Sequence, residues 1–171
     1  MVPDSLHTPC RVARLKPGDG ACLRSIRLEA LARYPRHFSA QHAEEAAHDV
    51  AWFEALIQTQ AVYGLWHAAH GLIGTSCITP QTRPEHQHRA KLRMVYIRPE
   101  HQGRGLSRLL LRHVLTYPPE GLEQITLKVS TYNQVALRLY QQCGFVEYGR
   151  EPQALKLAEG VYYDHVLMLY R

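Results

Sequence analysis

The chain has 171 residues, of which 46% are apolar and 20% charged, and its formal net charge is +5. This length suits one domain, residues 1–171, with a sizeable core. No apolar run approaches the ~20 residues that a helix needs to cross a bilayer. The composition therefore excludes a membrane-spanning helical protein, and we expect a soluble, globular one.

The N-terminal segment and the cysteines indicate the compartment. Residues 1–14 lack the apolar stretch of a signal peptide, so we expect a cytoplasmic protein with no membrane partner. The cysteines are scattered along the chain, and we expect reduced thiols instead of disulfides. They are Cys10, Cys22, Cys77 and Cys143.

The basic net charge and the eleven histidines could each indicate a ligand. A basic balance is compatible with nucleic acid, an anionic membrane or a phosphorylated cofactor. No block of five or more Lys and Arg residues occurs, which argues against a nucleic-acid partner. The histidines form neither a His-Glu-x-x-His pair nor a cluster with cysteine, so we expect no metal site.

The first third of the chain predicts a strand and two helices. Residues 11–16 are a candidate strand that residues 17–20, Pro-Gly-Asp-Gly, would end. Apolar residues at helical spacing predict a helix over 21–34, and Pro35 stops it because the residue before proline avoids the α region. Ser39 is a candidate N-cap for a second helix that runs to about Thr59.

The rest of the chain alternates strands and helices. Residues 61–67 and 72–79 predict a hairpin around His70-Gly71, and 80–89 a polar loop. We expect a strand near 91–98, a helix near 104–116, a strand near 124–130 and a helix near 133–142, with Gly144 just past its end. Two closing strands are expected near 145–149 and 161–169. The order β-α-α-β-β-β-α-β-α-β-β predicts an α/β fold, a mixed sheet with helices on both faces.

A glycine-containing loop between the strand near 91–98 and the following helix is a candidate anion site. Gly103 and Gly105 would let the backbone approach an oxyanion closely. The first-turn N–H groups of the helix would point at the ligand, and Ser107 could add a hydroxyl. A tight turn before an amphipathic helix explains the same spacing equally well.

Three arginines strengthen the anion interpretation. Arg104, Arg108 and Arg112 recur every four residues and would form a basic stripe beside the loop. Leu106, Leu109, Leu110 and Val114 would face the core. No Gly-Lys-Ser/Thr follows the loop, so it is not a nucleotide P-loop. The Gly-x-Gly-x-x-Gly dinucleotide motif is also absent.

The segment Gln102-Gly103-Arg104-Gly105-Leu106-Ser107 resembles the Arg/Gln-x-x-Gly-x-Gly/Ala motif of the GCN5-related N-acetyltransferases (GNAT). Ser107 replaces the last small residue. The resemblance implies that this loop binds the pyrophosphate of acetyl-coenzyme A, with Arg104 and Arg108 on its phosphates. It also implies that main-chain groups of Val95, Tyr96 and Ile97 hold the pantetheine arm and thioester, where the central strand splays from its neighbour.

A second motif follows downstream. Residues 133–145 resemble the family's Asn-x-x-Ala-x-x-x-Tyr-x-x-x-Gly-Phe. Asn133 and Tyr140 are seven apart and share a helix face, with the small Ala136 between them. The resemblance implies that both contact the cofactor and that Tyr140 protonates the departing thiolate. The alternative is that Asn133 is an N-cap and Tyr140 a core aromatic.

The resemblance implies an enzyme that moves an acetyl group from acetyl-coenzyme A to a primary amine by direct attack in a ternary complex. The general base stays open among Glu29, Glu54, His86, His88 and a chain of waters, because 91–93 reads Lys-Leu-Arg where many relatives carry a Glu. The acceptor, a small-molecule or peptide amine, would bind between 20–60 and 150–165. A homodimer is compatible with the sequence. Two other functions stay open: a non-catalytic coenzyme A-binding module and a basic binder of nucleic acid or phosphorylated ligands.

Overall fold

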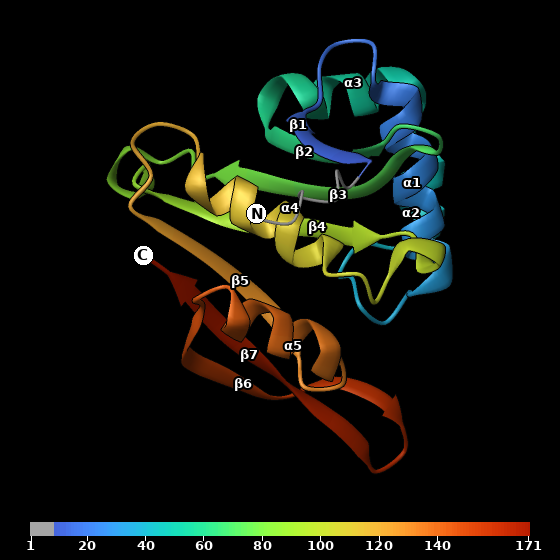
Figure 1. The fold of residues 1–171 in the computed structure, drawn as a ribbon. Coiled ribbons are helices and arrows are strands. Elements are labelled where there is room, and N and C mark those ends of the chain that lie inside the picture. Colours follow the sequence, from blue (N-terminus) through green and yellow to red (C-terminus); the bar gives the residue numbers. More distant parts are fainter. Residues whose placement is uncertain (1–8) are drawn as a thin grey trace, which may run out of the picture.

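The computed structural model describes residues 9–171, in which seven strands form one mixed sheet in the order β1-β2-β3-β4-β5-β7-β6 (Figure 1). Residues 1–8, part of the segment in which we expected no signal peptide, lie outside the described residues. The strands are β1 (Cys10–Arg14), β2 (Ala61–His67), β3 (Gly71–Pro80), β4 (Arg89–Ile97), β5 (Gln124–Ser130), β6 (Val146–Ala158) and β7 (Val161–Tyr170). The helices are α1 (Gly20–Arg33), α2 (His42–Ala46), α3 (Val50–Thr59), α4 (Leu106–Thr116) and α5 (Gln134–Gln142), with short 3-10 turns η1 (Pro84–His86) and η2 (Pro99–His101).

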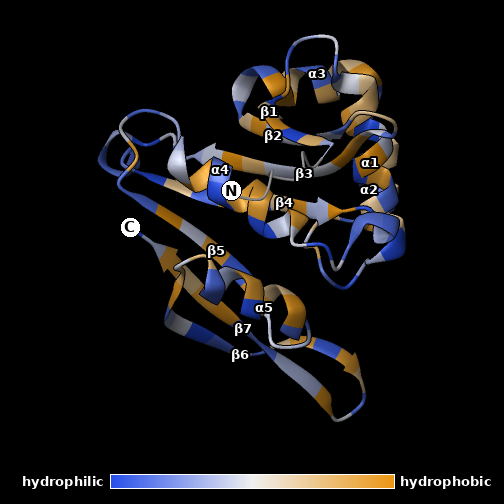
Figure 2. Ribbon diagram, viewed as in Figure 1, coloured by the Kyte–Doolittle hydropathy of each residue, from blue (hydrophilic) through white to orange (hydrophobic). Residues whose placement is uncertain are grey.

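Helices cover both faces of the sheet, as the element order predicts. Alternate residues of each strand point to opposite faces, so neighbours such as Leu72 and Ile73 enter different clusters. One cluster packs α1 and α3 against β2–β4, and the other packs α4 and α5 against the opposite face. Apolar and polar bands alternate along α4 and α5, as expected for helices with one buried face (Figure 2). No helix among residues 9–171 is long and apolar enough to cross a membrane.

The expected single helix from Ser39 to Thr59 is wrong. The structure has two helices here, and Ser39 precedes both of them. The second begins at Asp49, whose side chain accepts a hydrogen bond from the backbone N–H of Trp52 at 3.1 Å. Aspartate satisfies exposed N–H groups at a helix start and competes with the helical ladder in an interior. Asp49 therefore starts a separate helix inside the segment for which Ser39 predicted only one.

The closing hairpin is also longer than expected. β6 was predicted to end near residue 149, but it runs to Ala158 and forms the edge of the sheet beside β7. Pro152 is tolerated because the pairing with β7 shifts register between Glu151 and Leu155, and proline is found in edge strands and at bulges. In Figure 1 this hairpin, in red, reaches well past α5.

The reassigned helix start can be tested by stability. Asp49→Ala removes the capping oxygen and should lower the free energy of unfolding by about 1 kcal/mol, which is about 2–4 °C in Tm for a domain of this size. Ser39→Ala is the matched control and should stay within about 0.5 kcal/mol of wild type. Urea unfolding measures both, and a larger loss from Ser39→Ala would restore the single-helix prediction.

Candidate functional site

The sheet splits between its two central strands. β4 and β5 are parallel and pair through only three residue couples: Arg89 with Gln124, Ala90 with Ile125, and Lys91 with Thr126. Beyond Lys91 the strands diverge, and Figure 1 shows the gap widening toward the carboxyl end of β4. This is the separation that the family resemblance implied. It leaves main-chain groups of residues 92–97 on the β5 side without a strand partner, although backbone N–H and C=O groups need one.

A bulge in β4 lies at the split. Met94 has φ 57°, a left-handed conformation that is uncommon for a residue with a side chain. The pairing of β3 with β4 shifts register at this point, between Thr75 and Cys77. The hydroxyl of Thr75 donates to the carbonyl of Met94 at 3.0 Å and holds the bulge in place. Bulges of this kind re-aim the backbone near functional sites, here at Val95 and Tyr96.

The glycine-containing loop follows β4 directly. Gly103 and Gly105 both have φ 74°, and no atom lies within 4 Å of where a Cβ would stand on either. Gly105 is the N-cap of α4, and no side chain caps this helix. The N–H groups of Leu106, Ser107 and Arg108, in the first turn, lack helical partners. The loop therefore presents an open, uncapped helix N-terminus, the arrangement that suits an anion.

Gln102 is bonded within the protein at both its side chain and its backbone. Its side-chain amide donates to the carbonyl of Ile97 at 2.8 Å, and its backbone N–H donates to Pro99. These bonds tie the loop to the end of β4. A cofactor contact of Gln102 stays a prediction.

The arginines and Leu109 line the outer side of the loop. Arg104, Arg108 and Arg112 are exposed, and none pairs with a carboxylate among residues 9–171. A depression of about 300 Å³ is lined by Gly105, Arg108, Leu109 and Arg112. Leu109, expected in the core, is 41% exposed and forms part of this lining. The positive charge beside the loop is thus free to meet a polyanionic ligand.

Helix α5 confirms the structural interpretation of its motif, while its contacts with a cofactor stay a prediction. Asn133 is the N-cap, and its side-chain oxygen accepts from the N–H of Ala136 at 3.1 Å, which leaves the amide NH₂ as a donor. Tyr140 is 9% exposed, packs against Phe145, and shares the buried cluster of Leu106 at the start of α4. Burial, and then the neighbouring Cys143, raises the pKa of the Tyr140 phenol. A phenol kept protonated in this way can serve as an acid.

The structure separates the four candidate bases. His86 and His88 lie just before β4, at the end of that strand where β4 and β5 are still paired. Glu54 accepts hydrogen bonds from the N–H groups of Gly18 and Gly20 and holds the start of α1. Only Glu29 is linked to the split, through residue 96 of β4.

Glu29 is already held by three partners. The hydroxyl of Tyr96 donates to it at 2.8 Å, and Arg98 and Arg33 lie 3.3 and 3.8 Å away. Burial first, and then this hydrogen bond, raise the pKa of Tyr96. Glu29 thus ties α1 to the end of β4.

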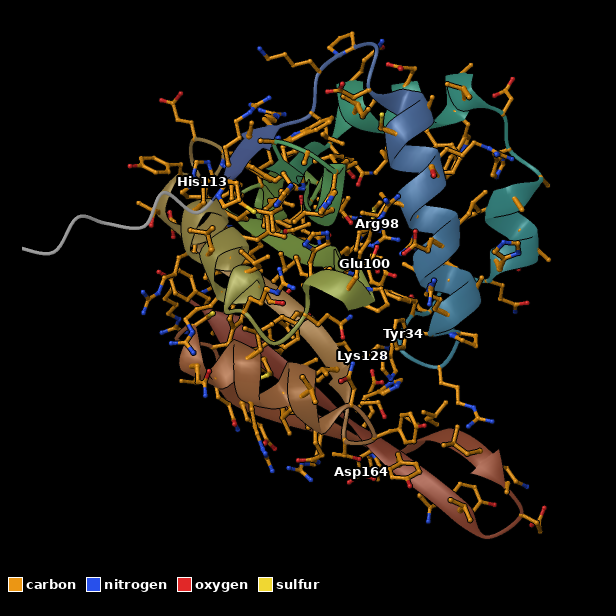
Figure 3. All side chains as sticks on the ribbon, turned by 45° about the vertical axis from the view of Figure 1, so that its right-hand side comes forward. Tyr34, Arg98, Glu100, His113, Lys128 and Asp164 are labelled. Atoms are coloured by element: carbon orange, nitrogen blue, oxygen red, sulfur yellow. The ribbon has the colours of Figure 1, made fainter. Side chains whose placement is uncertain are left out.

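Sequence analysis missed the side chains that face the opening from its two arms. In Figure 3, Tyr34 and Arg98 lie on the arm of α1 and β4, and Lys128 and Asp164 lie on the arm of β5 and β7. Lys128 pairs with Glu151 at 3.2 Å, and Asp164 with Arg150 at 3.6 Å. Tyr34 had entered the sequence analysis only as the end of a helix. No group of three His, Cys, Asp or Glu in residues 9–171 is placed to hold a metal ion.

Comparison with known proteins agrees with this geometry. Residues 25–145 match the profile of the acetyltransferase (GNAT) family. The chain belongs to the GNAT family. It is 42% identical over 64 residues to spermidine N(1)-acetyltransferase of Vibrio cholerae, covering 36% of this chain and 37% of that protein. It is 28% identical over 125 residues to the L-amino acid N-acyltransferase MnaT of Escherichia coli, covering 64% of each.

A solved GNAT structure matches the fold. The putative acetyltransferase yncA of Salmonella typhimurium, solved with its cofactor acetyl-CoA, superposes with a TM-score of 0.75 at 19% identity. The match covers 95% of this chain and 93% of that one. The mixed sheet with helices on both faces is thus the GNAT fold. The chain spans only about a third of the length of the first curated relative and about two thirds of the length of the second.

Proposed function

We propose that this protein transfers an acetyl group from acetyl-coenzyme A to a primary amine by direct attack in a ternary complex. One observation carries the proposal: the split between β4 and β5 opens onto an uncapped helix N-terminus with two left-handed glycines. A long, thin, polyphosphorylated thioester fits both the split and the helix N-terminus. Membership of the GNAT family and the acetyl-CoA complex of yncA support the same cofactor.

The residues present fit each part of that cofactor. The pyrophosphate would lie over Gly103 and Gly105, on the first-turn N–H groups of α4. Arg104 and Arg108 would add charge-assisted contacts. The pantetheine arm would take the place of a paired strand and meet the free main-chain groups of residues 95–97. The amide NH₂ of Asn133 is a further donor on the α5 side.

The reaction follows from these positions. The amine nitrogen attacks the thioester carbonyl carbon, and main-chain N–H groups of β4 near the bulge stabilise the oxyanion that forms. The carbon–sulfur bond then breaks, and the Tyr140 hydroxyl gives its proton to the thiolate. Holding both substrates in one complex supplies the orientation that a bimolecular reaction lacks in water.

The acceptor is a small-molecule or peptide amine that binds between the two arms. The relatives act on spermidine and on L-amino acids by name, which fits a small polar amine. A non-catalytic coenzyme A-binding module would share the loop but release no thiol. The domain extent, the cytoplasmic location and a homodimer stay predictions.

A thiol-release screen over polyamines, amino acids, aminoglycosides and peptides tests the proposal. Acetyl-coenzyme A should raise the melting temperature by ligand linkage, and RNA should not. A stabilised protein that releases no coenzyme A with any amine would favour the binding module. Stabilisation by RNA alone would favour a nucleic-acid binder, whose affinity should fall steeply with salt.

Gly105→Val should abolish acetyl-coenzyme A binding in calorimetry. A valine side chain would stand where the phosphates approach, and it would also strain a residue with φ 74°. Gly121→Val is the matched control, because Gly121 has φ 80° and equally open surroundings away from the loop. We expect the two variants to be destabilised to a similar extent, and only Gly105→Val to lose affinity for acetyl-coenzyme A. Unchanged affinity in a folded Gly105→Val protein would remove the phosphate-loop assignment.

Arg108→Ala should weaken acetyl-coenzyme A binding by about tenfold or more, since it removes a charge-assisted contact to phosphate. Arg112→Ala, one turn further from the helix N-terminus, should have a smaller effect. Both residues are exposed, so the difference should shrink at high salt. Equal losses in the two variants would contradict this placement of the phosphates.

Tyr140→Phe should lower kcat by about 10²–10⁴-fold and spare cofactor affinity, because the proton is needed only as the thiolate forms. The phenyl ring keeps the packing against Phe145. Tyr170→Phe is the control, since Tyr170 also packs on Phe145, at 5.5 Å between ring centroids. Full kcat in Tyr140→Phe, with chemistry shown to be rate-limiting, would make Tyr140 a core aromatic.

A further inference from the structure

Five rings cross the open side of the split in one continuous row. They are Tyr96, Tyr34, His37, Tyr132 and Tyr163, and successive ring centroids lie 6.1, 5.2, 5.9 and 5.2 Å apart. We call these residues the aromatic row. It starts on β4, passes through the end of α1 and the segment after it, and finishes on β7. The row therefore connects the two arms that the sheet itself leaves apart.

The row touches the split at both strands. Tyr96 follows the bulge at Met94, where the free main-chain groups of β4 begin. Tyr132 comes directly before Asn133, and its N–H donates to the hydroxyl of Ser130 at the end of β5. An amine that attacks a thioester held in the split must approach past these rings. Aromatic faces also attract ammonium groups, so the row suits an amine ligand.

His37 lies at the centre of the row and is its only member with a basic nitrogen. The ring stacks on Tyr34 with an interplanar angle of 16° and meets Tyr132 edge-on. These two phenols face the imidazole from α1 and from the loop before α5. Among residues 9–171 its ring nitrogens have no hydrogen-bond partner, and the residue is exposed. The imidazole is thus oriented by stacking and open to a ligand.

The surroundings favour the neutral imidazole. Although the residue is exposed, desolvation of its ring lowers the pKa of His37, and no charged side chain contributes to the shift. A neutral imidazole can accept a proton at physiological pH. Glu29, the candidate base from the sequence that is linked to the split, already accepts from Tyr96 and pairs with Arg98. His37 is therefore the unengaged proton acceptor on the acceptor side.

We propose that His37 is the general base that removes the proton from the attacking amine while the aromatic row holds that amine. The inference rests on the proposed acetyl transfer. The nitrogen–carbon bond forms as the amine attacks, and the amine proton passes to a ring nitrogen of His37, directly or through one water. The carbon–sulfur bond breaks, and the thiolate takes a proton from Tyr140. His37 then returns its proton to solvent, and the Tyr140 phenolate takes a proton back from solvent.

The test compares His37→Phe with His48→Phe, using the best amine from the thiol-release screen. Phenylalanine keeps a stacking ring and removes the nitrogen. His48 is the matched control, because it is also exposed and stacks on an aromatic ring, Trp52, at 4.3 Å between centroids, outside the row. We expect His37→Phe to lower kcat by about 10²–10⁴-fold with unchanged affinity for acetyl-coenzyme A. His48→Phe should match wild type.

The pH profile separates a base from a structural role. Wild-type kcat should fall as the pH drops through the lowered pKa of His37, because the protonated ring cannot accept a proton. This acidic limb should be missing in His37→Phe. His37→Gln, which keeps a polar side chain, gives the same comparison if the Phe variant does not fold.

The two proposals fail in different ways. Suppose that the wild-type protein turns over, and that the His37 variants keep its kcat or its acidic limb. That result would overturn His37 as the base, while the proposal of acetyl transfer would stand. Loss of acetyl-coenzyme A affinity in the His37 variants would give the residue a structural role instead. A wild-type protein that binds acetyl-coenzyme A but acetylates no amine would overturn both.

Discussion

The structure depends on hydrogen bonds that its two central strands do not make. Backbone N–H and C=O groups inside a protein need partners, and a continuous sheet would give them to each other. Here β4 and β5 stop pairing after three residue couples. One buried cluster keeps the two halves together, because it joins residues of β2–β4 and α4 with residues of β5, β7 and α5. The molecule is thereby left with a slot of unpaired peptide groups next to a helix N-terminus.

The parts around the slot follow from that separation. The bulge at Met94 turns the backbone of β4, and the bond from Thr75 holds it there from the intact side of the sheet. Gln102 ties the glycine loop to the last residue of β4, so that the loop and the strand form one surface. Asn133 begins α5 on the opposite side and keeps a donor free. The slot thus has rigid walls before any ligand arrives, which favours tight and oriented binding.

Much of this site could be predicted because it is encoded locally. Gly103, Gly105, Asn133 and Tyr140 lie in two short motifs, and local spacing is enough to place them on a loop and on one helix face. The aromatic row could not be found in this way, because Tyr34, His37, Tyr132 and Tyr163 come from segments up to 129 residues apart and meet only in the folded chain. The helix break at Asp49 was missed because Ser39 is also a suitable N-cap residue. The length of β6 was missed because its pairing with β7 continues past Pro152 only through a shift of register, which the sequence does not show.

The three residue couples between β4 and β5 have a consequence for the protein in a cell. In the proposed complex, acetyl-coenzyme A lies where strand pairing is missing and bridges the two halves of the sheet. Any ligand that binds only the folded state stabilises it in proportion to the logarithm of its free concentration. The resistance of this protein to unfolding would then vary with acetyl-coenzyme A supply. When the metabolite is scarce, the enzyme would lose part of its substrate and part of its conformational stability together.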